Sequence, residues 1–289
     1  MKRKFLPLFL LSCLAVIAAA DSTSVSPVDP TELVAWLTAG ISSKRLVRLV
    51  HERGLAIAPT AREMQQLAAA GADQYLVRAL TNLKPVAVNA PRPRAPKALL
   101  RAAENVRIGR YRQAEVQLRA ALRLDPQNAA LHFALAAMLR QQEQWDDAYD
   151  ELTTSVKLMP DFPENHSCLA YVFYRVDDGP NAIAEARTAL SMDPKNAEAY
   201  RDLGLALQST EQYTAAAHAF SESLSRDPDS PDTYYDLGIA LQAEGKMSAA
   251  EAAYRHASHL RTASILQREE HDLPPASTSI RASHVENPR

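Results

Sequence analysis

The chain has 289 residues, with 32 Lys and Arg against 34 Asp and Glu, so its formal net charge is −2. Hydrophobic residues make up 47% and charged residues 23%, the balance of a folded soluble protein. The near-zero charge argues against a general nucleic-acid binder. The eight glycines and 6% aromatic residues argue against turn-rich β-barrels and β-sandwiches, so a helical protein is expected.

Residues 1–20 have the order of a secretory signal peptide. Basic residues at 2–4 precede an apolar run, and small residues at 18–20 come directly before Asp21. The apolar run covers residues 5–20, which is short for a membrane span of about 20 residues. Cleavage after Ala20 is predicted, so the protein is expected to be exported, either periplasmic or secreted. An uncleaved anchor is the alternative.

Cys13 allows a second interpretation of this segment. Leu10-Leu11-Ser12-Cys13 resembles a lipoprotein cleavage box, which would make Cys13 the lipidated first residue of a membrane-anchored lipoprotein. Leu11 is bulky for its position, and residues 14–20 stay apolar where a lipoprotein turns polar. Cys13 is therefore interpreted as an ordinary signal residue. After cleavage Cys168 is the one cysteine left, so no intramolecular disulfide is expected.

A short leader at 21–28 is followed by a small helical module at 29–84. Asp29-Pro30-Thr31-Glu32 predicts an N-cap, a proline in the first turn and a glutamate that reaches back to the cap. Thr60 and Glu63 predict a second capping box. The apolar spacing and the helix-breaking residues between these points predict four short helices.

The module is basic. Residues 21–97 contain ten Lys and Arg and six Asp and Glu, and Lys44, Arg45 and Arg48 lie together at the start of the second predicted helix. A solvated helix face is the favoured interpretation. Contact with an anionic surface is the alternative.

Two proline-containing segments lie outside the predicted helices. Residues 85–96 contain four prolines, which predicts an extended, semi-rigid linker. Residues 272–289 contain prolines and several Ser and Thr without an apolar period, which predicts a disordered tail.

The middle of the chain repeats with a period of 34 residues. Pro126, Pro160, Pro194 and Pro228 define the period, and repeats start at 95, 129, 163, 197 and 231, so the array covers 95–262. Small residues recur at the eighth place of the repeat and alanines at the twentieth. The twenty-fourth place holds apolar or aromatic residues of varying size. The three sets are Ala102, Ala136, Ala170, Gly204 and Gly238; Ala114, Ala148, Ala182, Ala216 and Ala250; and Leu118, Leu152, Ala186, Phe220 and Tyr254. Two closely packed antiparallel helices per repeat are predicted.

This pattern resembles the tetratricopeptide repeat family. Repeats 4 and 5 fit best, whereas repeat 1 has Arg101 in place of a leucine, repeat 3 has an unusual turn at 177–180, and repeat 5 has Thr262 in place of the proline. The resemblance implies an all-α protein, a right-handed α-solenoid of helix-turn-helix repeats, here preceded by the four-helix module.

The resemblance also implies a non-enzymatic scaffold that binds a peptide or protein in the concave groove lined by the first helices, and the signal-peptide pattern at residues 1–20 places this scaffold in the cell envelope as an expectation. Tyr and Arg, which are favoured at interaction hot spots, are frequent at the inward places. The candidate residues are Phe133, Arg140, Tyr171, Tyr174, Arg175, Arg201, Gln208, Tyr235 and Gln242. The outward glutamates Glu151, Glu185 and Glu222 are expected to be energetically neutral. A protein or peptide partner is expected, with no nucleic acid and membrane contact only through the signal or anchor.

No enzyme motif stands out. The chain has no Gly-rich phosphate loop, no Gly-x-Ser-x-Gly and no His-Glu-x-x-His. His132 and His166 are expected to be structural, His256 and His259 to be solvated, and Cys168 to be inert. Neither a cofactor nor a metal is predicted.

Three other functions stay open at this point. The protein could be a self-assembling structural component of the envelope, because the last repeat lacks an obvious capping helix. It could be a lipid-anchored adaptor through Cys13. An enzyme with its active site in the 29–84 module is the least favoured.

Overall fold

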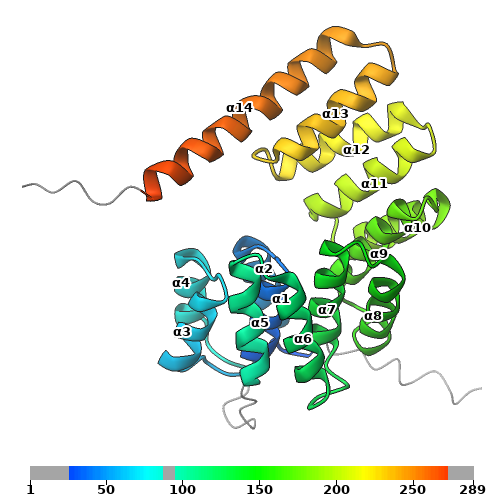
Figure 1. Cartoon of the computed structure of the whole chain (residues 1–289). Helices are drawn as coiled ribbons and strands as arrows, with labels where there is room; N and C mark the ends of the chain where they lie inside the picture. Colours follow the sequence, from blue (N-terminus) through cyan, green and yellow to red (C-terminus); the bar gives the residue numbers. More distant parts are fainter. Residues whose placement is uncertain (1–25, 87–94, 273–289) are drawn as a thin grey trace, which may run out of the picture. The chain divides into compact units, whose positions relative to one another are not determined.

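The computed structural model describes residues 26–86 and 95–272 (Figure 1). Fourteen helices lie in this part of the chain, which forms the predicted all-α repeat solenoid. The predicted signal peptide with Cys13, the middle of the predicted linker and the predicted tail after residue 272 fall outside the described residues. The chain divides into two compact units, Met1–Asp161 and Phe162–Arg289, here called the N-terminal and C-terminal units.

The module in the N-terminal unit has four helices. Both predicted capping boxes are confirmed: the Asp29 side chain accepts from the backbone N–H of Thr31 and Glu32, while Glu32 accepts from the N–H of Asp29 at 2.9 Å. Thr60 and Glu63 make the equivalent exchange. The helices are α1 (Pro30–Thr38), α2 (Ser43–Arg53), α3 (Ala61–Ala69) and α4 (Gln74–Asn82).

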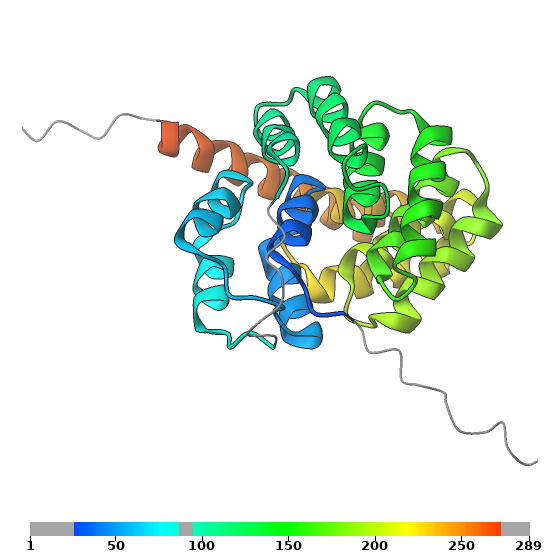
Figure 2. The same ribbon diagram turned by 90° about the horizontal axis from the view of Figure 1, so that it is seen from below.

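The N-terminal unit also contains the first two repeats, and α1 packs against the first helix of each. Figure 2 shows the blue α1–α2 segment between the cyan α3–α4 pair and the teal and green helices of these repeats. Eight of the nine residues of α1 are buried, with Trp36 fully enclosed. The module is thus joined to the repeats by a shared core around α1. The repeat helices are α5 (Lys97–Arg107), α6 (Tyr111–Leu122), α7 (Ala129–Gln141) and α8 (Trp145–Leu158).

The C-terminal unit contains three repeats whose first helices begin at the expected residues. Pro163 and Pro231 stand in the first turn of their helices, while Asn196 and Ser230 cap theirs through the side chain, as predicted. Its core includes Phe220. The helices are α9 (Pro163–Arg175), α10 (Gly179–Met192), α11 (Ala197–Ser209), α12 (Tyr213–Arg226), α13 (Pro231–Ala243) and α14 (Met247–Asp272).

Helix α14 continues beyond the predicted end of the array at residue 262. It has 26 residues, whereas α12 has 14 and ends at Arg226, just before Asp227-Pro228. The fifth repeat has Thr262 at the proline position, so its backbone keeps the N–H and the helical geometry that proline would remove. None of the described helices is long and apolar enough to cross a membrane.

Candidate protein-binding face

The candidate residues Phe133 and Arg140 lie on α7, in the N-terminal unit. Phe133 is 3% exposed, so it belongs to the core and is not the accessible binding residue that the sequence predicts. The physical reason is that α1 packs against α5 and α7, the helices whose inward places the sequence predicts to be open. Arg140 is half-buried.

Three candidates form a cluster on α9. The rings of Tyr171 and Tyr174 are 6.0 Å apart and tilted by 54°. The Arg175 guanidinium lies 5.9 Å from the Tyr171 ring centroid, and its Nη1 donates to the Tyr171 hydroxyl at 3.2 Å. The spacings of three and four residues place all three side chains on one helix face. Both tyrosines are half-buried and Arg175 is exposed, so part of each side chain is available to a partner.

Arg201, on α11, has a structural partner that the sequence analysis missed. Its Nε and Nη2 lie 2.9 and 2.8 Å from Asp236 Oδ2 on α13. Burial outweighs the ion pair at Asp236 and raises the pKa of its carboxyl group. At Arg201 burial lowers the pKa, but the attraction and hydrogen bond of Asp236 outweigh it and raise the pKa of the guanidinium. The two short contacts favour the charged pair. Arg201 therefore connects repeats 4 and 5, and its removal is expected to affect the fold as well as binding.

The same inter-repeat arrangement occurs one repeat earlier. Ser167 Oγ donates to Asp202 Oδ2 at 2.6 Å, and both residues are buried. Ser167 and Arg201 hold the fifth place of their repeats, while Asp202 and Asp236 hold the sixth place of the next ones. The aspartates recur with the 34-residue period, which is the sequence signal that could have identified them.

The last two candidates lie on α13 beside α14. Tyr235 is 45% exposed, and its ring centroid lies 5.5 Å from that of Tyr254. The Arg261 guanidinium lies 5.5 Å from the Tyr235 ring centroid. Gln242 accepts a hydrogen bond from the Tyr254 hydroxyl at 3.0 Å. Arg261 also pairs with Asp232 at 2.9 Å. Helix α14 thus supports this end of the face.

Gln208 completes the set of candidates in the C-terminal unit. It lies on α11 and is half-buried, while the neighbouring Leu205 is 4% exposed. The accessible candidates of this unit are therefore aromatic and amide side chains with one exposed arginine. They are Tyr171, Tyr174, Arg175, Gln208, Tyr235 and Gln242.

The outward glutamates make contacts within their own repeats, and their neutrality toward a partner stays a prediction. Glu151 lies 2.6 Å from His132 Nδ1, and Glu185 lies 2.7 Å from His166 Nδ1. Each pair connects the two helices of one repeat, which agrees with the structural role predicted for the histidines. Glu222 pairs with Arg226 at 2.7 Å within α12.

The basic cluster predicted on α2 is also altered by burial. Arg45 is 8% exposed, and its Nη1 lies 3.5 Å from Glu52 Oε2. Lys44 is exposed and Arg48 is half-buried. The three residues therefore do not present one continuous cationic surface.

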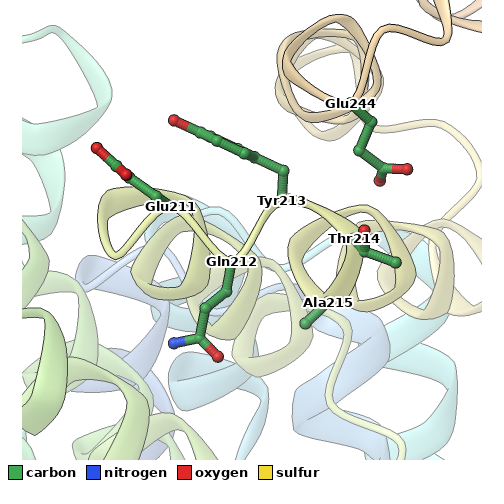
Figure 3. A pocket seen from close by; sticks show the side chains of 6 residues that line it. All are labelled: Glu211, Gln212, Tyr213, Thr214, Ala215 and Glu244. Atoms are coloured by element: carbon green, nitrogen blue, oxygen red, sulfur yellow. The ribbon is translucent and has the colours of Figure 1, made fainter.

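Three pockets of the described structure contain none of the candidate residues. One of about 490 Å³ lies where α12 begins and α13 ends, and Figure 3 shows the side chains of Gln212, Tyr213 and Glu244 diverging around it. A binding pocket normally has convergent polar groups, which this one lacks. Among residues 26–86 and 95–265, no group of three or more His, Cys, Asp or Glu could hold a metal ion.

Two solved structures with TM-scores above 0.5 share the fold at low sequence identity. TTC0263, a thermophilic tetratricopeptide repeat protein of Thermus thermophilus, is 18% identical with a TM-score of 0.53, over 60% of this chain and 95% of that chain. PilW, a widely conserved type IV pilus biogenesis factor, is 21% identical with a TM-score of 0.52, over 56% of this chain and 74% of the PilW chain. MamA from Desulfovibrio magneticus RS-1 is 17% identical with a TM-score of 0.49, over 57% of this chain and 94% of the MamA chain.

Sequence comparisons give the family. No curated protein matches the chain. Family models described as tetratricopeptide repeats match residues 108–170, 169–210 and 202–258. Because these matches together span just over half of the 289 residues, the chain belongs to the tetratricopeptide repeat family.

Proposed function

We propose that the chain is a non-enzymatic scaffold that binds a peptide or protein partner through the first helices α9, α11 and α13. The observation that carries this proposal is the set of partly exposed aromatic and amide side chains on these three helices. Tyrosine rings offer a large contact area with few rotamers to immobilise, and glutamine amides can pair with a peptide backbone. The partner contact is therefore expected to centre on Tyr171, Tyr174 and Tyr235.

A role in the cell envelope rests on residues 1–20, whose composition favours export. Anchoring through a lipidated Cys13 is the alternative form of the same proposal. Intact-mass measurement of the protein from an envelope fraction distinguishes them, because cleavage before Asp21 and acylation at Cys13 give different masses.

A self-assembling scaffold is less well supported. Ser258 of α14 is exposed at the place where repeats 1 to 4 hold Leu122, Val156, Leu190 and Leu224. Glu251 is likewise exposed on α14. A polar outer helix is what a terminal repeat needs in order to end an array in water. Met247 and Ile265 are also exposed on α14, at 57% and 55%, so the polar character of this helix is partial and self-assembly stays the alternative.

Site-specific photocrosslinking followed by affinity measurement tests the proposal. A photoreactive phenylalanine analogue replaces Tyr171 or Tyr235, and Tyr149 on the second helix α8 serves as the matched control, because it is 40% exposed. Adducts are expected from the first two positions and not from the control. With the purified adduct partner, Tyr171→Ala and Tyr235→Ala should each weaken binding about 5- to 30-fold. Equal weakening by Tyr149→Ala would place the partner on the other face.

A further inference from the structure

The small net charge hides an unequal distribution along the chain. Residues 26–124 contain 16 Lys and Arg and 7 Asp and Glu, whereas residues 125–272 contain 11 and 25. Charge asymmetry of this kind indicates interaction with a charged partner. The first repeat alone, residues 95–124, has seven basic and two acidic residues.

The basic residues of the first repeat gather on the α5–α6 turn and along α6. Arg107 and Arg110 lie at the turn, Arg112 and Arg119 lie on α6, and Arg123 caps its C-terminus. All five are exposed. Arg119 is engaged by Glu115 at 2.8 Å. For Arg107, Arg110 and Arg123, none of the carboxylates in the described part of the chain is an ion-pair partner.

Exposed apolar side chains lie among these arginines. Ile108 is 50% exposed, Val116 61% and Leu124 76%. Residues 112, 116, 119 and 123 recur at intervals of three or four, so they form one stripe along α6. The turn and helix together present a basic surface with isolated apolar side chains, here called the basic stripe.

The repeat fold does not require this chemistry. At the places of Arg112 and Val116, the second helices of the later repeats have acidic, small or polar residues. These are Asp146 and Asp150 on α8, Pro180 and Ala184 on α10, Thr214 and His218 on α12, and Ser248 and Ala252 on α14. At the place of Arg119 the third and fifth repeats have Arg187 and Arg255, and at the place of Arg123 the second repeat has Lys157. Only the first repeat combines arginine at all three of these places with an exposed valine, and this combination needs its own explanation.

We propose that the basic stripe binds an anionic lipid surface. Guanidinium groups attract anionic headgroups, and single apolar side chains between them can insert at the boundary with the acyl chains. Ile108, Val116 and Leu124 are separated by arginines, so they do not make the apolar centre that a stable protein interface has. A nucleic acid would use the arginines but leave these apolar side chains in water.

Vesicle co-sedimentation tests the proposal. The probe is the chain from residue 21 onward, which keeps every described residue and removes the apolar run at 5–20 that would bind lipid by itself. Binding is expected to phosphatidylglycerol-containing vesicles and not to pure phosphatidylcholine, and it should weaken as salt is added. Absence of this selectivity overturns the proposal.

Charge-reversed variants locate the surface. Arg110→Glu with Arg123→Glu should lower vesicle affinity at least tenfold. The control is Arg187→Glu with Arg255→Glu, which changes the same charge at exposed places of α10 and α14 that correspond to Arg119. This control should bind vesicles as the parent chain does. An equal loss of vesicle affinity in the two double variants overturns the proposal. Circular dichroism melting of every variant separates lost binding from lost folding.

Two further measurements separate this surface from the alternatives. Ile108→Ser with Leu124→Ser leaves the charge unchanged and should still weaken vesicle binding, because the inserted side chains are lost. Sedimentation velocity at low salt without lipid tests whether the stripe instead holds the acidic residues of a second copy. Self-association that Arg110→Glu with Arg123→Glu abolishes would overturn the lipid proposal. Tyr171→Ala should leave vesicle binding intact, so the proposed partner-binding function can fail independently.

Discussion

The eighth and twenty-fourth places of a repeat share one volume. A Cβ atom added to Gly204 would lie 2.5 Å from the Phe220 ring, and one added to Gly238 would meet the Tyr254 ring. Repeats 1 and 2 have alanine at the eighth place and the smaller leucine at the twenty-fourth. In repeats 4 and 5 glycine at the eighth place makes room for an aromatic ring at the twenty-fourth, whereas repeats 1 and 2 combine alanine with leucine.

Gly204→Ala is expected to destabilise the protein by about 1–3 kcal/mol, because the Phe220 ring is fully buried and cannot move aside without disturbing the core. Gly204→Ala with Phe220→Leu recreates the pair found in repeats 1 and 2 and should recover part of that loss. Urea unfolding of both variants and of Phe220→Leu alone measures the coupling. Additive effects in this cycle would contradict the shared volume.

Glu32 is a second residue whose environment governs stability. Burial, together with the nearby Asp29, raises its pKa to about 7, although the Asp29 N–H and Arg53 oppose the shift. A folded pKa above the unfolded value of 4.5 contributes stability that is complete below about pH 4.5 and lost as the pH rises through 7.

Glu32→Gln should therefore leave stability nearly unchanged at pH 4.5 and raise it at pH 8, by on the order of 2–3 kcal/mol. The glutamine can still accept the Asp29 N–H of the capping box, so the helix start is kept. Denaturant unfolding of both proteins across this pH range provides the measurement. A difference that stays constant with pH would show that Glu32 titrates normally.

At the level of helices and turns, the fifteenth place of every repeat adopts the left-handed conformation. Gly109 and Gly245 have φ angles of 72° and 78°, and the non-glycine residues Glu143, Asp177 and Glu211 have φ angles of 59°, 62° and 59°. The backbone requirement is thus common to all five turns, while glycine appears in two. Sequence inspection misses it because three turns use a residue that tolerates this conformation only with strain.

Glu211→Gly should relieve that strain, and the gain should be small, up to about 1 kcal/mol, since glycine also loses more entropy on folding. Gly109→Ala introduces the same strain and should destabilise by about 1 kcal/mol or more. Thermal melting of the two variants gives the signs. Destabilisation by Glu211→Gly would mean that the glutamate side chain makes a contact that outweighs the backbone strain.

The contact between α7 and α8 is expected to depend on pH. Partial burial lowers the pKa of His132, but the hydrogen bonds to Glu151 and to the Pro126 carbonyl outweigh it and raise the pKa above 6.5. The corresponding stabilisation is complete below about pH 6.5 and is lost as the pH rises through the folded-state pKa.

His132→Gln should therefore reduce stability at pH 5.5 by on the order of 1 kcal/mol and have a smaller effect at pH 8.5. Chemical denaturation of the variant and the parent at both pH values makes the comparison. Equal losses at the two values would show that His132 acts through packing alone.

Most helix boundaries could be predicted because they depend on local chemistry. The prolines that end the second helices and the side-chain caps of the first helices act within a few residues, and the 34-residue period repeats these signals along the chain. The continuation of α14 was also readable from Thr262, since the residue that ends the other second helices is missing there. The Arg201–Asp236 contact was not, because it joins residues on different repeats.

At the scale of the whole molecule, packing between distant segments decides which predicted binding residues are accessible. The inward places of the first helices are predicted from the repeat alone, yet α1 packs against α5 and α7 from a segment about 60 to 100 residues earlier in the chain. Period and amphipathicity describe which face of a helix is apolar, and they do not say whether another segment covers it. Sequence reasoning therefore assigns Phe133 to a binding face, although the residue belongs to a core.

This difference predicts opposite effects for two aromatic residues at the same place of different repeats. Phe133 and Tyr235 both hold the fifth place, but Phe133 is 3% exposed on α7 and Tyr235 is 45% exposed on α13. Phe133→Ala removes a buried ring and should lower the unfolding free energy by about 3–5 kcal/mol. Tyr235→Ala removes a largely solvated ring and should lower it by less than about 1 kcal/mol.

Partner affinity should show the reverse order. Once a partner is purified, Tyr235→Ala is expected to weaken its binding about tenfold, because the ring is part of the accessible face. Phe133→Ala should leave affinity within about twofold at a temperature where that variant is still folded, since no partner can reach a side chain beneath α1. Calorimetric titration beside denaturant unfolding of the two variants measures both quantities. Strong loss of affinity in folded Phe133→Ala would mean that α1 leaves its place when the partner binds, and that the first two repeats also take part in recognition.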